Sequence, residues 1–139
     1  MTDEVVVDAS VAAKCFFTEA GSDDARRFVA TGVALIAPDL IFAEIASVAS
    51  KKVRRGEISE LLGRDAVEAL ADLLDEIVPS RGLARRGFDL AVEHGFSAYD
   101  AIYLALAESR MTRVVTADAK LIARTLRSGL QGLAGSPEG

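Results

Sequence analysis

Short apolar runs alternate with longer amphipathic segments along the chain. The short runs are rich in Val and Ile, a pattern typical of strands that are buried on both faces. We expect four strands, the last including its exit turn: residues 4–7, 33–38, 76–80 and 112–118. The longer segments place apolar residues at helical spacing, and several begin at a capping Ser or end at Gly. We expect helices over residues 9–17, 22–32 (with Ser22 as the cap), 39–55, 58–74, 81–94, 97–110 and 119–129.

Strands that alternate with helices predict an α/β fold. The expected architecture is a three-layer α/β/α domain, in which a parallel sheet is covered on both faces and crossovers are right-handed. The sheet has four strands, or five if residues 130–133 add a short edge strand. We expect residues 1–128 to form this domain and residues 129–139 to form a flexible, Gly-rich tail. In such sheets, functional residues gather beyond the carboxyl ends of the strands.

The composition and charge of the chain limit the classes of function. Half of the 139 residues are hydrophobic and 27% are charged, which is typical of a globular protein. The net charge of −5 argues against a general nucleic-acid-binding surface, but a metal-dependent enzyme meets phosphates through its cations. The chain has no run of about 18 apolar residues and no secretory signal, so we expect a cytoplasmic protein without membrane contact. The single cysteine, Cys15, is interpreted as a core residue.

Four acidic residues occupy positions that ordinary packing does not require. Asp8 and Asp118 follow the first and fourth expected strands, and Asp100 lies near the start of an apolar helix. Glu44 is the only charged residue in the segment LIFAEIASVA, residues 40–49. Helix capping is an equally good explanation for Asp8 and Asp118, and the capping-box pattern S-x-x-D is a strong one for Asp100. Glu44 lies too deep in its helix to be a cap, and a buried carboxylate without a partner is costly.

A joint explanation is that the four carboxylates converge at one edge of the sheet and bind a divalent cation. Without a cation, such a cluster would repel itself and raise some of its pKa values. Mg²⁺ and Mn²⁺ prefer oxygen ligands, and an all-carboxylate site suits phosphodiester hydrolysis. Other chemistries have less support, since the chain has no Cys/His group for zinc, no Gly-rich phosphate loop and no aromatic-rich sugar cleft. The only histidine, His94, is interpreted as a structural residue at a helix end.

Four segments together resemble the PIN domain and, more narrowly, the VapC-type toxin ribonucleases of bacterial toxin–antitoxin pairs. They are VVVDASVAAKCFFTE, APDLIFAEIASVASKKVRRGEIS, FSAYDAIYLALAE and VVTADAKL, and the resemblance covers roughly residues 4–125. It implies a homodimeric endoribonuclease that depends on Mg²⁺ or Mn²⁺, cleaves RNA and is inhibited by a cognate VapB-like antitoxin. The acids that match the family's metal-binding and catalytic residues are Asp8, Glu44, Asp100 and Asp118. Of these acids, Asp8 and Asp100 match the two residues that the family most commonly assigns to the metal itself. Ser10 and Thr116 match the hydroxyl residues that support the first and last acids.

Two other functions fit the same fold. A catalytically inactive scaffold protein is one rival, although a decayed site would be expected to keep fewer acids. A metal-dependent DNA nuclease is the other, although the large insertions expected of such an enzyme are missing from 139 residues.

The basic and aromatic residues outside this set have more than one interpretation. The segment KKVRR, residues 51–55, would either guide RNA toward the acids or simply favour the C-terminal end of its helix. Lys14 would either contact a phosphate or be a surface lysine, and the second interpretation is favoured. Tyr99 and Tyr103 are interpreted as packing residues.

Overall fold

The computed structural model describes residues 4–138 as seven α-helices, one short 3-10 helix and a five-stranded sheet. The strands are β1 (Glu4–Val7), β2 (Ala34–Pro38), β3 (Glu76–Val78), β4 (Val114–Val115) and β5 (Ala134–Gly135). The helices are α1 (Ala9–Phe16), α2 (Ser22–Val29), α3 (Ile41–Arg54), α4 (Glu60–Leu73), α5 (Ala84–His94), α6 (Ala98–Ser109) and α7 (Ala119–Arg127), with the 3-10 helix η1 (Ser80–Gly82) before α5.

All five strands run parallel, in the order β3-β2-β1-β4-β5. β1 lies in the middle, where Val5 pairs with Leu35 of β2 and Val6 pairs with Val114 of β4. The chain therefore builds the sheet outward from β1 to β3 and then crosses back to add β4 and β5 on the other side. Open α/β sheets bind ligands where this direction changes, beyond the carboxyl ends of the strands. In this protein that point lies between β1 and β4.

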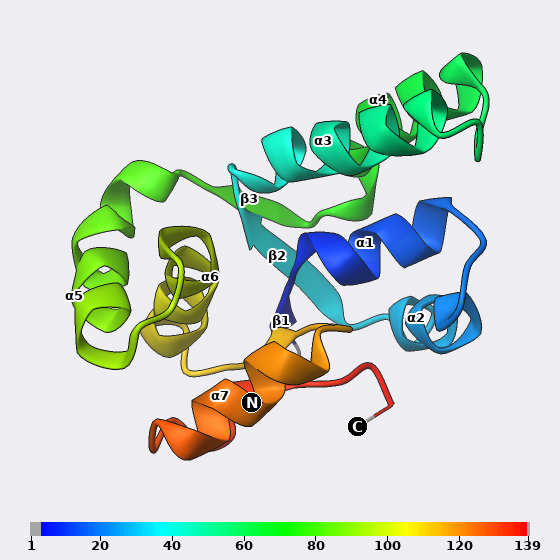
Figure 1. Ribbon diagram of the computed structural model, residues 1–139. Helices are drawn as coiled ribbons and strands as arrows, with labels where there is room; N and C mark the ends of the chain where they lie inside the picture. The colour runs from blue at the N-terminus through cyan, green and yellow to red at the C-terminus, as the bar shows by residue number, and fades with distance from the viewer. Residues whose placement is uncertain (1–3, 139) are drawn as a thin grey trace.

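Helices cover both faces of the sheet, so the predicted three-layer α/β/α architecture is confirmed (Figure 1). On one face α6 packs against β1, β2 and β4, and α5 packs on α6. On the other side α1 packs against both α2 and α3, and α3 and α4 form a pair that extends past the end of β2 (Figure 1). The core lies between these layers and includes the fully buried Val6, Val7, Ile36 and Leu104.

Burial along the strands follows their place in the sheet. The three valines of β1, Val5 to Val7, are at most 5% exposed because β1 has a neighbour on each side and a helix on each face. β3 is an edge strand, and its Glu76 and Ile77 are exposed. The expectation of strands buried on both faces is therefore wrong for β3.

Two local predictions differ from the structure. The fifth strand forms at Ala134–Gly135 rather than at residues 130–133, because Val114 N donates to Leu133 O (2.8 Å) and the register with β4 continues to Gly135. β5 thus lies inside the predicted tail, and a domain boundary at residue 128 stays a prediction.

The second difference concerns the start of α2. Ser22 is the first residue of this helix, and the cap is Gly21, whose φ of +90° suits glycine. The Ser22 hydroxyl instead donates to Phe17 O and accepts from Glu19 N, both at 2.9 Å. It therefore closes the turn between α1 and α2 rather than capping α2.

Candidate active site

Asp8 lies at the carboxyl end of β1 and is the N-cap of α1. Its Oδ1 accepts hydrogen bonds from Ser10 N (3.0 Å), Val11 N (3.2 Å) and the Ser10 hydroxyl (2.5 Å). These bonds all use one carboxylate oxygen and leave Oδ2 out of the cap. The residue is only 9% exposed, and this burial raises the pKa of Asp8 although the hydrogen bonds oppose it.

The exit from β4 repeats this construction one strand away. Asp118 is the N-cap of α7, and its Oδ1 accepts from Lys120 N (2.9 Å) and Leu121 N (3.3 Å). Thr116 is completely buried just after β4, and its hydroxyl accepts from Asp118 N at 3.0 Å. The backbone between β4 and α7 is thereby fixed with Asp118 at the surface.

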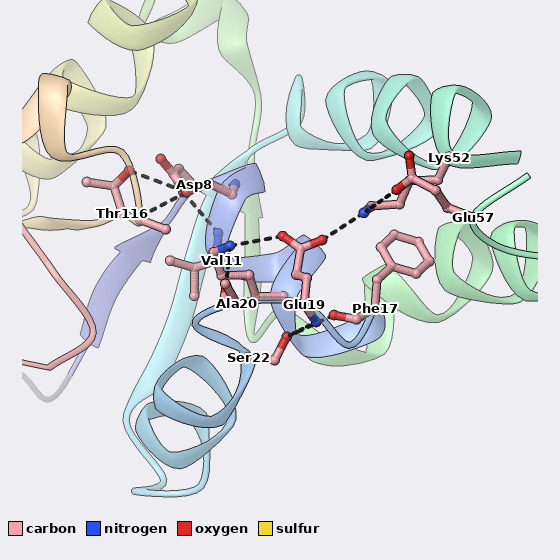
Figure 2. A network of polar contacts seen from close by, with 12 residues as sticks. Asp8, Val11, Phe17, Glu19, Ala20, Ser22, Lys52, Glu57 and Thr116 are labelled. Carbon is pink, nitrogen blue, oxygen red and sulfur yellow. Dashed lines mark hydrogen bonds and ion pairs between the residues drawn. The ribbon is translucent and has the colours of Figure 1, made fainter. Parts of the chain in front are cut away.

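Two hydroxyls connect these strand exits across the point where the sheet changes direction. Ser10 Oγ lies 3.4 Å from Thr116 Oγ1, and it accepts a hydrogen bond from Ala117 N at 2.9 Å. Figure 2 shows Thr116 beside Asp8 at the end of the central strands. A continuous hydrogen-bonded network therefore runs from Asp8 through Ser10 and Thr116 to Asp118.

Glu44 reaches this edge from α3, which begins beyond the carboxyl end of β2. It is half-buried, and the Tyr103 hydroxyl donates to its Oε1 at 2.6 Å. Burial raises the pKa of Glu44, and the negative charges of Asp8 and Asp100 raise it further, while the hydrogen bond from Tyr103 opposes them. Glu44 thus has a neutral partner that orients it, and two acidic neighbours that repel it.

Asp100 lies in the first turn of α6, where the Ser97 hydroxyl accepts from Asp100 N at 3.1 Å. The cap predicted at Ser97 is therefore present. Asp100 is half-buried, and burial raises its pKa, followed by repulsion from Asp118. The negative charge of Asp100 raises the pKa of Glu44, and the negative charge of Asp118 raises the pKa of Asp100. Asp100 therefore lies near both acids.

The four acids are coupled in pairs around the β1–β4 point: Asp8 with Glu44, Glu44 with Asp100, and Asp100 with Asp118. Between residues 4 and 138, no three His, Cys, Asp or Glu side chains lie close enough together to hold a metal ion as they stand. The donor chemistry nevertheless fits a hard divalent cation, because the groups are all carboxylates. Burial raises the pKa values of Asp8, Glu44 and Asp100, and acidic neighbours raise those of Glu44 and Asp100 further. A cation that draws them together would compensate both effects.

Comparison with known proteins identifies the family of the chain. The PIN domain family model matches residues 5–125. The chain belongs to the PIN-domain family. This PIN domain is 32% identical over 120 residues to Ribonuclease VapC3 of Pyrobaculum aerophilum, a match that covers 85% of this chain and 92% of the relative. It is 34% identical over 117 residues to Ribonuclease VapC9 of Mycobacterium tuberculosis, covering 84% and 87% of the two chains. The resemblance to the VapC type is thereby confirmed.

Solved structures agree with this PIN fold. PAE2754 of Pyrobaculum aerophilum superposes with a TM-score of 0.71 at 24% identity, over 94% of this chain and 82% of that one. VapC20 of Mycobacterium tuberculosis, described as a Sarcin-Ricin loop cleaving toxin, gives a TM-score of 0.69 at 17% identity, over 86% and 93%. At such identities the likeness concerns the fold alone.

Tyr103 has a role beside the acids that the sequence interpretation missed. It was expected only to pack, and it does so at 3% exposed, but its hydroxyl also holds Glu44. A signal was present, because Tyr103 lies three residues after Asp100 and so shares its face of the helix. Tyr99 is 65% exposed, so the prediction that it packs is wrong.

The surroundings of Lys14 and Cys15 differ from the prediction, and those of His94 agree with it. Lys14 is half-buried, not a surface lysine, and its Nζ donates to Glu19 Oε2 (2.9 Å) and Ala20 O (2.8 Å). Cys15 is only partly buried at the margin of the core. His94 ends α5 as expected and packs edge-on against Phe96. No helix within the described part of the PIN domain is long and apolar enough to cross a membrane.

Proposed function

We propose that this protein is a VapC-type endoribonuclease toxin that hydrolyses RNA phosphodiester bonds with Mg²⁺ or Mn²⁺. The observation that carries this proposal is the set of electrostatically coupled acids at the β1–β4 point, two of them on strand exits that share one hydrogen-bonded network. The VapC ribonuclease relatives at 32–34% identity support the choice of RNA over DNA as substrate. They also argue against an inactive scaffold protein.

In this proposal Asp8 and Asp100 are the main metal ligands, and Glu44 and Asp118 complete the site. A bound Mg²⁺ or Mn²⁺ would generate the hydroxide nucleophile and neutralise charge on the phosphate and the leaving oxygen. The protein's own contribution is to orient individual carboxylates beforehand, and the cation would draw them together. The cap hydrogen bonds fix Asp8 through Oδ1 and leave Oδ2 for a ligand, and Tyr103 fixes Glu44 through Oε1.

Ser10 and Thr116 act in this proposal by setting the relative position of Asp8 and Asp118. The Ser10 hydroxyl donates to Asp8 Oδ1, and the Thr116 hydroxyl accepts from Asp118 N. Neither hydroxyl therefore needs to touch the substrate. Their 3.4 Å contact joins the two strand exits, so a displacement of one acid would be transmitted to the other.

We also propose that the protein acts in the cytoplasm, forms a homodimer and is inhibited by a cognate VapB-like antitoxin. The names of the relatives support the toxin–antitoxin assignment. Exposed apolar side chains support association with protein partners: Phe88 is 66% exposed and Val92 70%, one turn apart on α5.

The test is Asp8→Asn, assayed for Mg²⁺- or Mn²⁺-dependent cleavage of single-stranded RNA. Asn caps helices as well as Asp does and keeps an Oδ1 for the bonds from Ser10 and Val11, so the fold should be retained. Because burial raises the pKa of Asp8, the ionised carboxylate opposes folding at neutral pH, and the variant should be at least as stable as the wild type.

The matched control is Asp65→Asn, which removes the same charge from an exposed position on α4. We expect no RNA cleavage by Asp8→Asn, wild-type cleavage by Asp65→Asn, and loss of wild-type cleavage in EDTA with recovery on adding Mn²⁺. Cleavage of DNA but not RNA of equal sequence would favour the DNA nuclease. Full RNA cleavage by Asp8→Asn would overturn the proposed mechanism.

A further inference from the structure

A groove of about 380 Å³ adjoins the acids on the side of α1 and α3. One end is formed by Ser10 and Asp118, and so belongs to the network that joins the exits of β1 and β4. The rest carries one acid, Glu19, and four basic side chains: Lys14, Lys51, Lys52 and Arg55. The groove thus runs from an acidic end to a basic one, in a protein whose net charge is −5.

Three residues that line this groove, Val48, Lys51 and Arg55, continue a row on α3 that begins at Glu44, which is not itself in the lining. Glu44, Val48, Lys51 and Arg55 are spaced by four, three and four residues, which places them on one face of the helix. From the helical rise, Lys51 lies about 10 Å and Arg55 about 16 Å along the axis from Glu44. A chain held at Glu44 would therefore meet the two cations in succession as it left the acids along α3.

The four cations of the groove are not equivalent. Glu19 accepts from both Lys14 Nζ (2.9 Å) and Lys52 Nζ (2.8 Å), and Figure 2 shows it reaching Lys52 from the α1–α2 connection. Both lysine side chains are less than 20% exposed. Lys51 is exposed, and the Arg55 side chain is 68% exposed with only a 4.0 Å approach to Glu57. Lys51 and Arg55 are therefore the cations available to a ligand.

We propose that this groove binds the sugar–phosphate backbone of single-stranded RNA beside the cleaved bond, with Lys51 and Arg55 contacting phosphates. The proposal rests on the proposed ribonuclease function and extends it by naming the path of the substrate. Polyanion binding by exposed cations requires no base-specific group, so this contact is independent of RNA sequence. An acidic protein partner is the less favoured occupant, because tight protein interfaces need buried apolar anchors. The apolar lining of this groove is limited to Ala13, Val48 and Ala117.

The structure also divides the basic segment at residues 51–55 into two surfaces. Arg54 points away from this groove and lines a different cavity between α3 and α4, together with Arg64. The double substitutions Lys51→Ala/Arg55→Ala and Arg54→Ala/Arg64→Ala therefore remove the same charge from two different surfaces, the groove and the α3–α4 cavity. Any difference between the two variants reports on position rather than on net charge.

The experiment measures binding of a fluorescent, mixed-sequence single-stranded RNA of about 12 nucleotides by anisotropy, in EDTA to prevent cleavage, over a range of salt concentrations. For Lys51→Ala/Arg55→Ala we expect about tenfold weaker binding, and a salt dependence whose logarithmic slope falls by about 1.4, or about 0.7 for each lost phosphate contact. For Arg54→Ala/Arg64→Ala we expect wild-type affinity and slope. Circular dichroism on both variants checks that the helices are intact.

Failure of this inference differs from failure of the proposed function. Absence of metal-dependent RNA cleavage by the wild type would contradict the ribonuclease assignment. Wild-type cleavage together with equal RNA affinities for the two double variants would overturn only the groove. The groove proposal would also be overturned if the wild type binds no RNA in EDTA, or if Lys51→Ala/Arg55→Ala weakens binding of an oligoglutamate peptide but not of RNA.

Discussion

Replacing Glu19 with Gln tests the half-buried ion network that supports one side of the groove. Glu19 bridges Lys14 on α1 and Lys52 on α3, and the three side chains are only 29%, 19% and 17% exposed. Gln keeps the shape of Glu19 and one carbonyl acceptor, but its amide group cannot accept from the second lysine. The substitution therefore removes at least one charge-assisted hydrogen bond and leaves a lysine without its counterion.

The expected loss is about 2 kcal/mol in the free energy of unfolding, the contribution of one hydrogen bond to a charged group. For a domain of this size, that corresponds to a fall in Tm of roughly 6–10 °C. Glu60→Gln is the control, because its 3.5 Å pair with Arg64 joins side chains that are 78% and 59% exposed. An exposed pair at that spacing contributes about 0.3–0.5 kcal/mol.

The effect of Glu19→Gln should also depend on pH. Burial raises the pKa of Glu19, but hydrogen bonds from Lys52 and Lys14 outweigh it and hold that pKa below its ordinary value. A carboxyl group with a lowered folded pKa stabilises the fold fully above its unfolded pKa, about 4.3, and progressively less as the pH falls through the folded pKa. The wild type should therefore lose its advantage over the variant only in acid.

Urea unfolding followed by circular dichroism, at pH 7 and at a series of lower pH values, measures both effects. The reasoning is refuted if Glu19→Gln costs no more than Glu60→Gln at pH 7. It is also refuted if the difference between wild type and Glu19→Gln persists unchanged at every acidic pH at which both proteins stay folded.

The remaining predictions concern the residues around Glu44. Tyr103→Phe removes the hydroxyl that donates to Oε1, so we expect about 1 kcal/mol lower stability together with reduced RNA cleavage; unchanged cleavage would show that Glu44 needs no orientation. Glu44→Gln removes a carboxylate from the proposed metal site, so calorimetry should show weaker Mn²⁺ binding. Because the variant keeps an acceptor for Tyr103 and loses the repulsion from Asp8 and Asp100, its thermal unfolding without metal should be little changed. If Mn²⁺ binding by Glu44→Gln matches that of the wild type, Glu44 is not part of a metal site.

The strand pattern made the architecture and the acidic edge predictable. Asp8 and Asp118 follow strands, and parallel strands end at one edge of a sheet, so their proximity followed from the topology alone. The fifth strand was misplaced because Ala134 and Gly135 carry no strand-forming side chains. They join the sheet through backbone bonds to β4, which only the folded register determines.

Long-range polar pairs were the part that the sequence could not provide. Glu19 meets Lys52 across 33 positions, and Tyr103 meets Glu44 across 59. Neither separation corresponds to a helical or strand spacing, so no local pattern predicts such a contact. The interpretation of Lys14 as a surface residue was wrong for the same reason, because the turn that encloses it depends on Ser22 and Gly21.

Capping and ligand binding, which were alternatives for Asp8 and Asp118, are compatible in the structure. Each carboxylate uses Oδ1 to accept backbone N–H groups at the start of a helix, where the helix dipole favours an anion. For Asp8, burial opposes this effect and raises the pKa, so a nearby cation would stabilise the ionised form of its carboxyl group. The cap fixes the direction of the second oxygen before any ligand arrives. A cation bound there would therefore supply charge compensation to acids that the strand exits and helix caps have already oriented.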